Sequence, residues 1–150
     1  VVVGRKLYFF TKQDNVYLGP CRMNTGIIVD MDTLAVQDFI VSGETTKSTF
    51  STSSTGQETI PACFDGSNTI YRWNYDSTNK GFLLSVDLTP ASGAGTSGSP
   101  FVLTQTSRAI SNSAFGYTAY VYKRMFWNSA ARCIQLLPSS NVRWQALKPA

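Results

Sequence analysis

Side chains alternate between two sides of the chain throughout segment 68–88, NTIYRWNYDSTNKGFLLSVDL, and this alternation constrains the fold more than any other feature. Aromatic residues recur at every second position in its first arm, and apolar residues do so in its second arm at 82–88. Successive residues of an extended strand point to opposite faces of a sheet, so a period of two predicts strands. The intervening DSTNKG has turn-forming chemistry, and the segment therefore predicts a β-hairpin.

The same kind of pattern returns in short runs along the rest of the chain. β-Prone residues gather at 1–10, 16–20, 25–30, 38–43, 101–105, 114–127, 131–138 and 141–147. Gly4 interrupts the first run, as a β-bulge would. With the hairpin, these runs give about eight to ten short strands separated by polar turns. We expect an all-β fold, either an antiparallel sandwich or jelly-roll-like fold or a barrel, built as one domain over residues 1–150.

Two segments leave room for a helix. In segment 32–39, DTLAVQDF, Asp32 has the side chain of a helix N-cap, but the same residues also alternate well enough to form a strand. The run 131–138 allows a helical turn, although its residues favour a strand. Neither segment is long enough to cover a parallel sheet, so α/β folds are not expected.

Low charge distinguishes the composition from that of an average globular chain. Asp, Glu, Lys and Arg make up 15% of the 150 residues, against about 25% in typical domains. A surface of hydroxyls and amides follows, which is typical of β-rich extracellular, virion or phage proteins. No apolar run approaches the length of about 20 residues that a membrane helix needs, so membrane insertion is not expected. The first residue is Val rather than Met, which suggests a domain excised from a larger protein.

The three cysteines, Cys21, Cys63 and Cys133, allow at most one internal disulfide. Their spacing matches no zinc motif, and the chain has no histidine to complete one. Three buried free thiols are expected, and a Cys21–Cys63 bridge is the alternative.

Charge is distributed unevenly along the chain. Residues 1–87 contain seven Lys or Arg and nine Asp or Glu, a charge of −2, whereas residues 88–150 contain six Lys or Arg and no acid, a charge of +6. The six are Arg108, Lys123, Arg124, Arg132, Arg143 and Lys148. If they share a face, it will attract anions such as sulfated or sialylated glycans, RNA or an acidic protein; if they are scattered, they only solubilise the domain. No Lys/Arg-rich run is present, so nucleic acid is not an expected partner.

The string GTSGSP at 95–100 resembles the nucleophile segment of chymotrypsin-like serine proteases, and the resemblance implies that Ser97 would be the nucleophile. A serine needs a base to remove its proton, and the histidine of that family has no counterpart in this chain. A Ser–Lys dyad with Lys80 or Lys123 is the formal alternative. We therefore expect no catalytic residue here. The segment is expected to be a mobile loop, with Thr96 and Ser97 at its tip available to hydrogen-bond a ligand or a neighbouring subunit.

This loop is expected to use left-handed backbone at its three glycines, Gly93, Gly95 and Gly98.

Two carboxylates, Asp30 and Asp32, stand at strand spacing and so on one face. Such a pair can bind Ca²⁺ or serve glycoside hydrolysis when further carboxylates are close. A strand end closed by an Asx turn is the expected explanation, because Asp38 is the only other acid nearby. We expect neither a metal nor a cofactor.

Aromatic and basic residues are interleaved near residue 124. Tyr120, Tyr122 and Arg124 fall on one side of an alternating strand, and Trp127 follows them. Aromatics beside cations can stack on sugar rings or bases, and they are also common in subunit interfaces. We predict a binding surface or a self-association surface at these residues, with plain decoration of the sheet as the alternative.

In general character the chain resembles the protruding, or spike, domains of non-enveloped virus capsid proteins. The resemblance rests on β-rich sequence, hydroxyl-rich loops, low charge and aromatics in strands. It implies a non-enzymatic domain at the virion surface that mediates host attachment, through an anionic glycan or another host receptor, and self-associates as a dimer or trimer. The same role fits a phage fibre. The alternatives are a protease-derived domain lacking its catalytic histidine, or a bacterial adhesin module at the cell surface.

Overall fold

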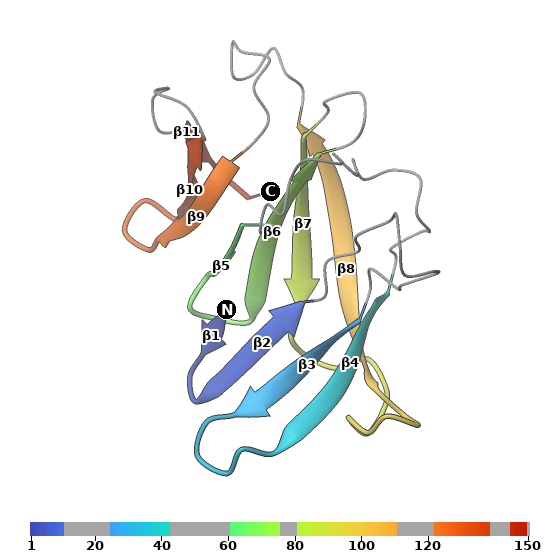
Figure 1. The fold of residues 1–150 in the computed structure, drawn as a ribbon. Helices are drawn as coiled ribbons and strands as arrows, with labels where there is room; N and C mark the ends of the chain where they lie inside the picture. Colours follow the sequence, from blue (N-terminus) through green and yellow to red (C-terminus); the bar gives the residue numbers. More distant parts are fainter. Residues whose placement is uncertain (11–24, 43–60, 76–80, 111–121, 139–144, 150) are drawn as a thin grey trace.

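A computed structural model of the chain describes residues 1–10, 25–42, 61–75, 81–110, 122–138 and 145–149. These residues form strands and turns, without a helix among them (Figure 1). The strands are β1 (Val2–Val3), β2 (Lys6–Phe10), β3 (Thr25–Asp30), β4 (Val36–Ser42), β5 (Ala62–Phe64), β6 (Thr69–Tyr75), β7 (Gly81–Asp87), β8 (Phe101–Ile110), β9 (Tyr122–Asn128), β10 (Cys133–Pro138) and β11 (Gln145–Leu147). The expected all-β fold is confirmed. Within the described ranges, no helix is long and apolar enough to span a membrane.

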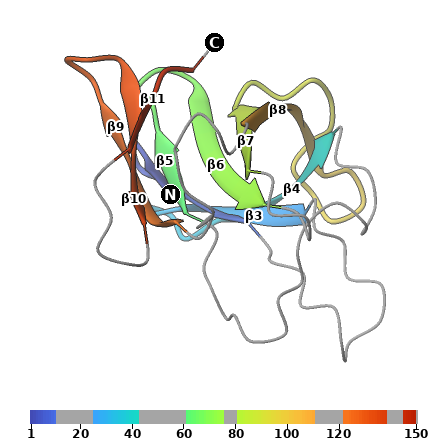
Figure 2. The same cartoon turned by 90° about the horizontal axis from the view of Figure 1, so that it is seen from above.

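Eight of the strands form one sheet in the order β1-β2-β3-β4-β8-β7-β6-β5. Neighbours in it are antiparallel, except that β4 and β8 pair in parallel, from Phe39 opposite Phe101 to Ser42 opposite Thr104. The outermost strands, β1 and β5, lie side by side in both views, so the sheet curls almost into a barrel (Figure 1 and Figure 2). The barrel and the sandwich expected as alternatives therefore occur together, because a second sheet covers part of the first.

The second sheet is small and antiparallel, in the order β11-β10-β9. Its strand β9 contacts β5 and β6, and Figure 2 shows the small sheet beside these strands, outside the curled sheet. The segment 131–138, which allowed a helical turn, forms β10 of this sheet. The predicted strand runs at 16–20 and 114–121 lie outside the described residues.

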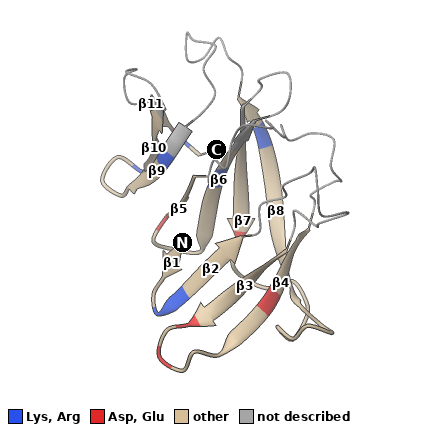
Figure 3. Ribbon diagram, viewed as in Figure 1, with Lys and Arg blue, Asp and Glu red and all other residues tan. Residues whose placement is uncertain are grey.

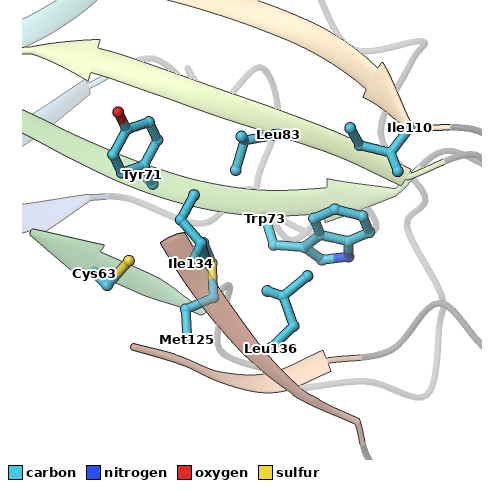
Figure 4. Close-up of a cluster of buried hydrophobic side chains, with 8 residues drawn as sticks. All are labelled: Cys63, Tyr71, Trp73, Leu83, Ile110, Met125, Ile134 and Leu136. Atoms are coloured by element: carbon cyan, nitrogen blue, oxygen red, sulfur yellow. The ribbon is translucent and has the colours of Figure 1, made fainter. Parts of the chain in front are cut away.

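Two hydrophobic clusters follow from this arrangement. The barrel cluster fills the inside of the curled sheet and contains Tyr8, Ile28, Phe39, Val41, Ile70, Val86, Leu88 and Leu103. The sandwich cluster lies between the two sheets and contains Cys63, Tyr71, Trp73, Leu83, Ile110, Met125, Ile134 and Leu136 (Figure 4). Each cluster draws residues from strands far apart in sequence, so both cores depend on the complete topology.

The β6–β7 hairpin separates the two clusters. Its register pairs Trp73 with Leu83 on one face and Ile70 with Val86 on the other. The hairpin and the alternation within each of its strands are as predicted from segment 68–88. Trp73 and Leu83 belong to the sandwich cluster, while Ile70 and Val86 belong to the barrel cluster. Both faces of the hairpin are therefore buried, which the alternation by itself did not predict.

A buried cation occupies the barrel side of this hairpin. Arg72 is only 3% exposed, and its guanidinium carbon lies 4.4 Å from the centre of the Phe10 ring on β2. The face of an aromatic ring is electron-rich, so this contact stabilises the buried charge. It also joins β2 and β6 across the inside of the curled sheet.

The helix allowed at 32–39 is wrong. Residues 31–34 form a four-residue hairpin loop, which Asp30 and Ala35 close through a backbone hydrogen bond of 2.9 Å, and β4 begins at Val36. The cap is Asp30 rather than Asp32: its Oδ1 accepts hydrogen bonds from the backbone N–H groups of Asp32 and Thr33 at 3.0 and 2.9 Å. Pairing of β4 with β3 outweighs the weak helical preference of this short segment.

The first run, 1–10, is divided in two. Gly4 lies in the turn between β1 and β2, with φ of +57°, and is not a bulge within one strand. The amide N–H of Tyr8 donates to the carbonyl of Val1 at 2.8 Å, which holds the short β1 against β2.

Candidate ligand-binding pocket

A pocket of about 630 Å³ opens beside the small sheet. The β5–β6 turn, the β9–β10 loop and the residues after β11 surround it. Its lining residues are Asp65, Gly66, Ser67, Tyr71, Trp127, Ser129, Ala130, Ala131, Arg132, Lys148 and Pro149. The volume lies within the range of about 300–1,000 Å³ that small-ligand sites occupy.

Asp65 organises the β5–β6 turn. Its Oδ1 accepts hydrogen bonds from the backbone N–H groups of Ser67, Asn68 and Thr69 at 2.8, 3.1 and 3.0 Å, and its Oδ2 accepts one from the Ser67 hydroxyl at 2.8 Å. Partial burial acts to raise the pKa of Asp65, but these hydrogen bonds to the charged form outweigh it and lower the pKa. The hydrogen bonds within the turn therefore hold the Asp65 carboxylate in place, and it forms a fixed part of the pocket wall.

The β9–β10 loop has the same construction as the β3–β4 loop. Asn128 and Cys133 are paired at its base, and Asn128 Oδ1 accepts a hydrogen bond from the Ala131 amide at 2.9 Å. In each loop the fourth residue has left-handed backbone, with φ of +47° at Arg132 and +59° at Leu34. This geometry fixes the backbone of Arg132, whose side chain lies at the edge of the pocket.

Tyr71 and Trp127 form the aromatic wall. Their ring centres are 5.8 Å apart and the ring planes differ by 17°, so the rings stack. Tyr71 is buried and its pKa is raised, chiefly by burial and next by the charge of Asp65, which favours the neutral phenol. Trp127 is partly buried against the sandwich cluster and also lines the pocket. The wall is therefore rigid, because the hydrophobic core supports it from behind.

The third wall is the segment after β11, and an arginine of the large sheet holds it. Arg108 Nη2 donates to the backbone carbonyl of Lys148 at 2.8 Å, across 40 positions of sequence. This bond fixes the backbone of Lys148, whose exposed side chain lines the pocket. Together with Arg132, Lys148 gives the pocket two exposed cations.

Among the described residues of the predicted binding surface, one lies in the pocket. Trp127 lines it, whereas Arg124 is exposed on the other face of β9. Tyr122 belongs to β9 but its side chain lies outside the described part, and Tyr120 lies outside the described residues altogether. The two members whose side chains are described, Arg124 and Trp127, thus lie on opposite faces of β9.

The pocket residues that were not predicted carried weaker signals. Tyr71 was visible only as one position of the alternating hairpin, and Arg132 and Lys148 only as members of the basic half. The Asp65–Gly66 pair is a common turn signal, but a turn does not by itself indicate a site. What brings these residues together is the packing of the small sheet on the large one.

The basic half of the chain is only partly concentrated. Arg132 and Lys148 line the pocket and Arg108 supports it, but Arg124 faces elsewhere. Figure 3 shows blue segments on β8 and β9, and also on β2, where red segments of β3, β4 and their connecting loop lie close by. Positive charge is thus least balanced on the side of β8 and the small sheet.

Thr96 and Ser97 lie in a tight turn that contributes nothing to the pocket lining. Thr96 and Ser99 exchange backbone hydrogen bonds of 3.0 and 3.2 Å, and Thr96 Oγ1 accepts a further one of 3.2 Å from the Ser99 amide. Ser97 is exposed at the tip, as expected. The carbonyl of Gly95 accepts a hydrogen bond of 2.9 Å from the Asp38 amide of β4. This last bond joins the segment to the sheet.

The glycines of this segment differ in their roles. Gly93 and Gly95 have φ of +91° and +75°, whereas Gly98 is outside the left-handed region, so that part of the expectation is wrong. A Cβ at Gly93 would overlap the carbonyl oxygen of Pro100, and one at Gly95 would lie 2.6 Å from the Phe101 ring. Close approach of the loop to β8 therefore requires both glycines.

The other candidate chemistries are structural where the structure describes them. Asp30 closes the Asx turn that was expected, and Arg5 Nε donates to the two carboxylate oxygens of Asp32 at 3.0 and 3.1 Å. Among the described residues no three His, Cys, Asp or Glu side chains cluster in a way that could hold a metal ion.

Two of the thiols can be placed. Cys63 and Cys133 are buried and free, so Cys63 forms no bridge, and Cys21 lies outside the described ranges. Burial raises the pKa of the Cys63 thiol to about 12, which keeps it protonated and unreactive at neutral pH.

The chemistry open to the pocket follows from its described lining residues. Its closest approach to a nucleophile and base is the Ser67 hydroxyl on Asp65, but a carboxylate with a lowered pKa and four hydrogen bonds is a weak base. Rigid aromatic rings beside two cations and a serine hydroxyl can instead hold a ring-bearing anion. Searches for related proteins give no further guidance: no family model matches the chain, and no curated protein or solved structure matches it either.

Proposed function

We propose that this chain is a non-enzymatic recognition domain that binds an anionic glycan in the pocket between the two sheets. The observation that carries the proposal is the stacked Tyr71–Trp127 pair with Arg132 and Lys148 beside it. A sugar ring presents an apolar face that can lie against the exposed part of Trp127, and a sulfate or carboxylate on that sugar can accept hydrogen bonds from the two cations.

The balance of charges in the pocket favours an acidic ligand over a neutral one. Asp65, the one acid among the described lining residues, has its charge compensated by four hydrogen bonds, whereas Arg132 and Lys148 are exposed. Exposed cations attract an approaching anion, and salt weakens the attraction. The proposal therefore predicts an affinity that falls as ionic strength rises, which a purely apolar site would not show.

The test compares two arginines of the same hairpin. Binding of sulfated and sialylated oligosaccharides, with their neutral parent sugars as controls, is measured by calorimetry at low and high salt. Arg132→Ala should weaken binding by about tenfold, because it removes a charge-assisted contact. Arg124→Ala removes the same charge from the opposite face of β9 and should leave binding unchanged.

Equal affinity for acidic and neutral sugars, or affinity that does not respond to salt, would contradict the proposal. So would a larger loss from Arg124→Ala than from Arg132→Ala. Unfolding curves of both variants accompany the measurement, because both side chains are exposed and neither substitution should alter stability by much.

A virion-surface location, as in the spike domains that the sequence resembles in character, remains our proposal for where such a domain acts. An all-β domain with a pocket for an acidic sugar fits host attachment. It equally fits an adhesin module at a cell surface, and the salt-dependent binding of acidic sugars does not distinguish the two.

A further inference from the structure

An apolar surface remains on the outside of the curled sheet, over β1 to β4. Tyr8 and Phe10 of β2 point into the barrel cluster, so their neighbours Leu7 and Phe9 point outward. The strand registers extend these positions into two rows of direct neighbours. One row runs Val2–Leu7–Val29–Val36 and the other runs Phe9–Ile27–Asp38. We call these seven residues the β1–β4 face.

The β1–β4 face is exposed, whereas the small sheet covers the outside of the sheet at β5 and β6. The small sheet and the sandwich cluster cover β5 and β6, but Val2, Phe9, Ile27 and Val36 are 55%, 51%, 37% and 58% exposed. Of the six large apolar residues that the described chain exposes, these are four; the others are Leu34 and Phe126. Monomeric proteins rarely leave apolar surface gathered in this way, and such patches usually mark contact sites.

The size of the face suits the centre of a small interface. The face spans four strands that are spaced by about 4.8 Å, and each strand extends by about 3.3 Å per residue. With Ile40 and Val102, which continue the outward positions onto β4 and β8, it covers about 400 Å². A specific interface takes about 800 Å² from each partner, with an apolar centre and a polar rim. The face supplies such a centre, and the surrounding loops must supply the rim, so we expect a reversible association.

Charge favours a second copy of the chain as the partner. The described residues 1–10 and 25–42 contain two Lys or Arg and three Asp, a side-chain charge of −1, and Arg5 and Asp32 neutralise each other. Asp38, which is partly buried, carries the only charge among the seven residues of the face, so two such surfaces can meet with little repulsion. Two copies that met through the pocket side would instead bring together Arg108, Arg132 and Lys148 from each. A nearly uncharged sheet face also offers no charge pattern by which a different, charged partner would be selected.

We propose that two copies of this domain associate through the β1–β4 face, sheet against sheet, to form a reversible dimer. No residue of the face belongs to the pocket lining, so both pockets of the dimer stay accessible. The dimer does not depend on what the pocket binds. The interface differs from the Tyr120, Tyr122 and Arg124 surface for which self-association was expected.

Light scattering and sedimentation equilibrium over a series of protein concentrations test the proposal. The unmodified chain should shift from monomer to dimer as concentration rises. The double substitution Phe9→Thr and Ile27→Thr should raise the dimer dissociation constant at least about tenfold, while threonine keeps the β-propensity of both strands. Phe126→Thr removes a comparably exposed apolar side chain from β9, outside the face, and should leave the dimer intact.

A second pair, Val2→Thr and Val36→Thr, repeats the test at other positions of the face should the first pair perturb folding. Three outcomes would overturn the proposal. They are a monomer at every concentration, open-ended aggregation without a discrete dimer, and a dimer that the face variants leave intact or that high salt dissociates. A dimer that persists in high salt and is lost in both pairs of variants would support it.

Discussion

Two residues, Leu34 and Arg132, hold left-handed backbone although neither is Gly or Asn. Each is the last residue of a four-residue hairpin loop, and each loop is fixed by a side-chain oxygen at its base, from Asp30 or Asn128. This conformation was not predicted from the residue types, because bulky residues with positive φ are uncommon. The loop geometry, rather than a local preference of leucine or arginine, determines it.

Replacing either residue by glycine should relieve strain. Left-handed backbone costs a residue with a Cβ about 1–2 kcal/mol, and glycine avoids this cost. Glycine also has more conformational entropy in the unfolded chain, which offsets part of the stabilisation. Leu34 is 74% exposed and loses little packing. We expect Leu34→Gly to raise the free energy of unfolding by about 0.5–1 kcal/mol in urea titrations.

The Leu34 change should leave ligand binding unaltered, since the loop is not part of the pocket lining. Arg132→Gly should stabilise the fold similarly yet weaken binding of the acidic sugar. Leu34→Val serves as the opposite control, because a branched Cβ suits left-handed backbone least. A loss of stability in Leu34→Gly would show that the leucine side chain contributes more than its exposure indicates.

The β5–β6 turn depends on one carboxylate, and this makes its stability depend on pH. The pKa of Asp65 is lower in the folded chain than in the unfolded one, so its contribution is complete above the unfolded pKa of about 3.9 and disappears as pH falls through the folded value. Asp65→Asn should lower the free energy of unfolding by about 1 kcal/mol at neutral pH. The difference from the unmodified chain should shrink in acid.

Unfolding curves at a series of pH values down to the acid range measure this effect. Asp38→Asn provides the matched control, since it removes one charge but none of the hydrogen bonds of the turn. A difference that stays constant with pH would show that the amide of asparagine disturbs the turn by its shape and not through its missing charge.

Elements formed by neighbours in sequence were predictable, and elements formed at a distance were not. Alternation in segment 68–88 identified both strands of the β6–β7 hairpin and the side-chain sets of each face. It could not reveal that Phe39 pairs with Phe101 in a parallel ladder, because no local pattern encodes a partner so distant. The pocket was unpredictable for the same reason: Tyr71, Arg132 and Lys148 meet only after the sheets pack.

At the scale of the molecule, the two clusters should unfold together, because the β6–β7 hairpin contributes to both. Leu83 of the sandwich cluster and Leu103 of the barrel cluster are 2% and 0% exposed. Leu83→Ala and Leu103→Ala remove the same atoms from different cores. Each should cost about 2–5 kcal/mol and shift one common transition.

Tryptophan fluorescence, which includes Trp73 of the sandwich cluster, and far-ultraviolet circular dichroism should report the same midpoint in both variants. The substitution Thr106→Ala, at an exposed position of β8, should change that midpoint little. A fluorescence midpoint that responds to Leu83→Ala but not to Leu103→Ala would mean that the cores are independent.

The parallel ladder between β4 and β8 also determines the order in which this chain can assemble. The β6–β7 hairpin joins segments that are separated by a few residues. The ladder instead joins Ser42 to Thr104, and the hairpin lies within the long segment between them. Bringing distant segments together carries an entropic cost before any contact compensates for it, so chains rich in such pairings fold slowly. Until the ladder forms, the barrel-cluster side chains of β2 to β4 lack the contacts that Leu103 of β8 supplies, so a half-formed sheet leaves more apolar surface in water than the folded domain does.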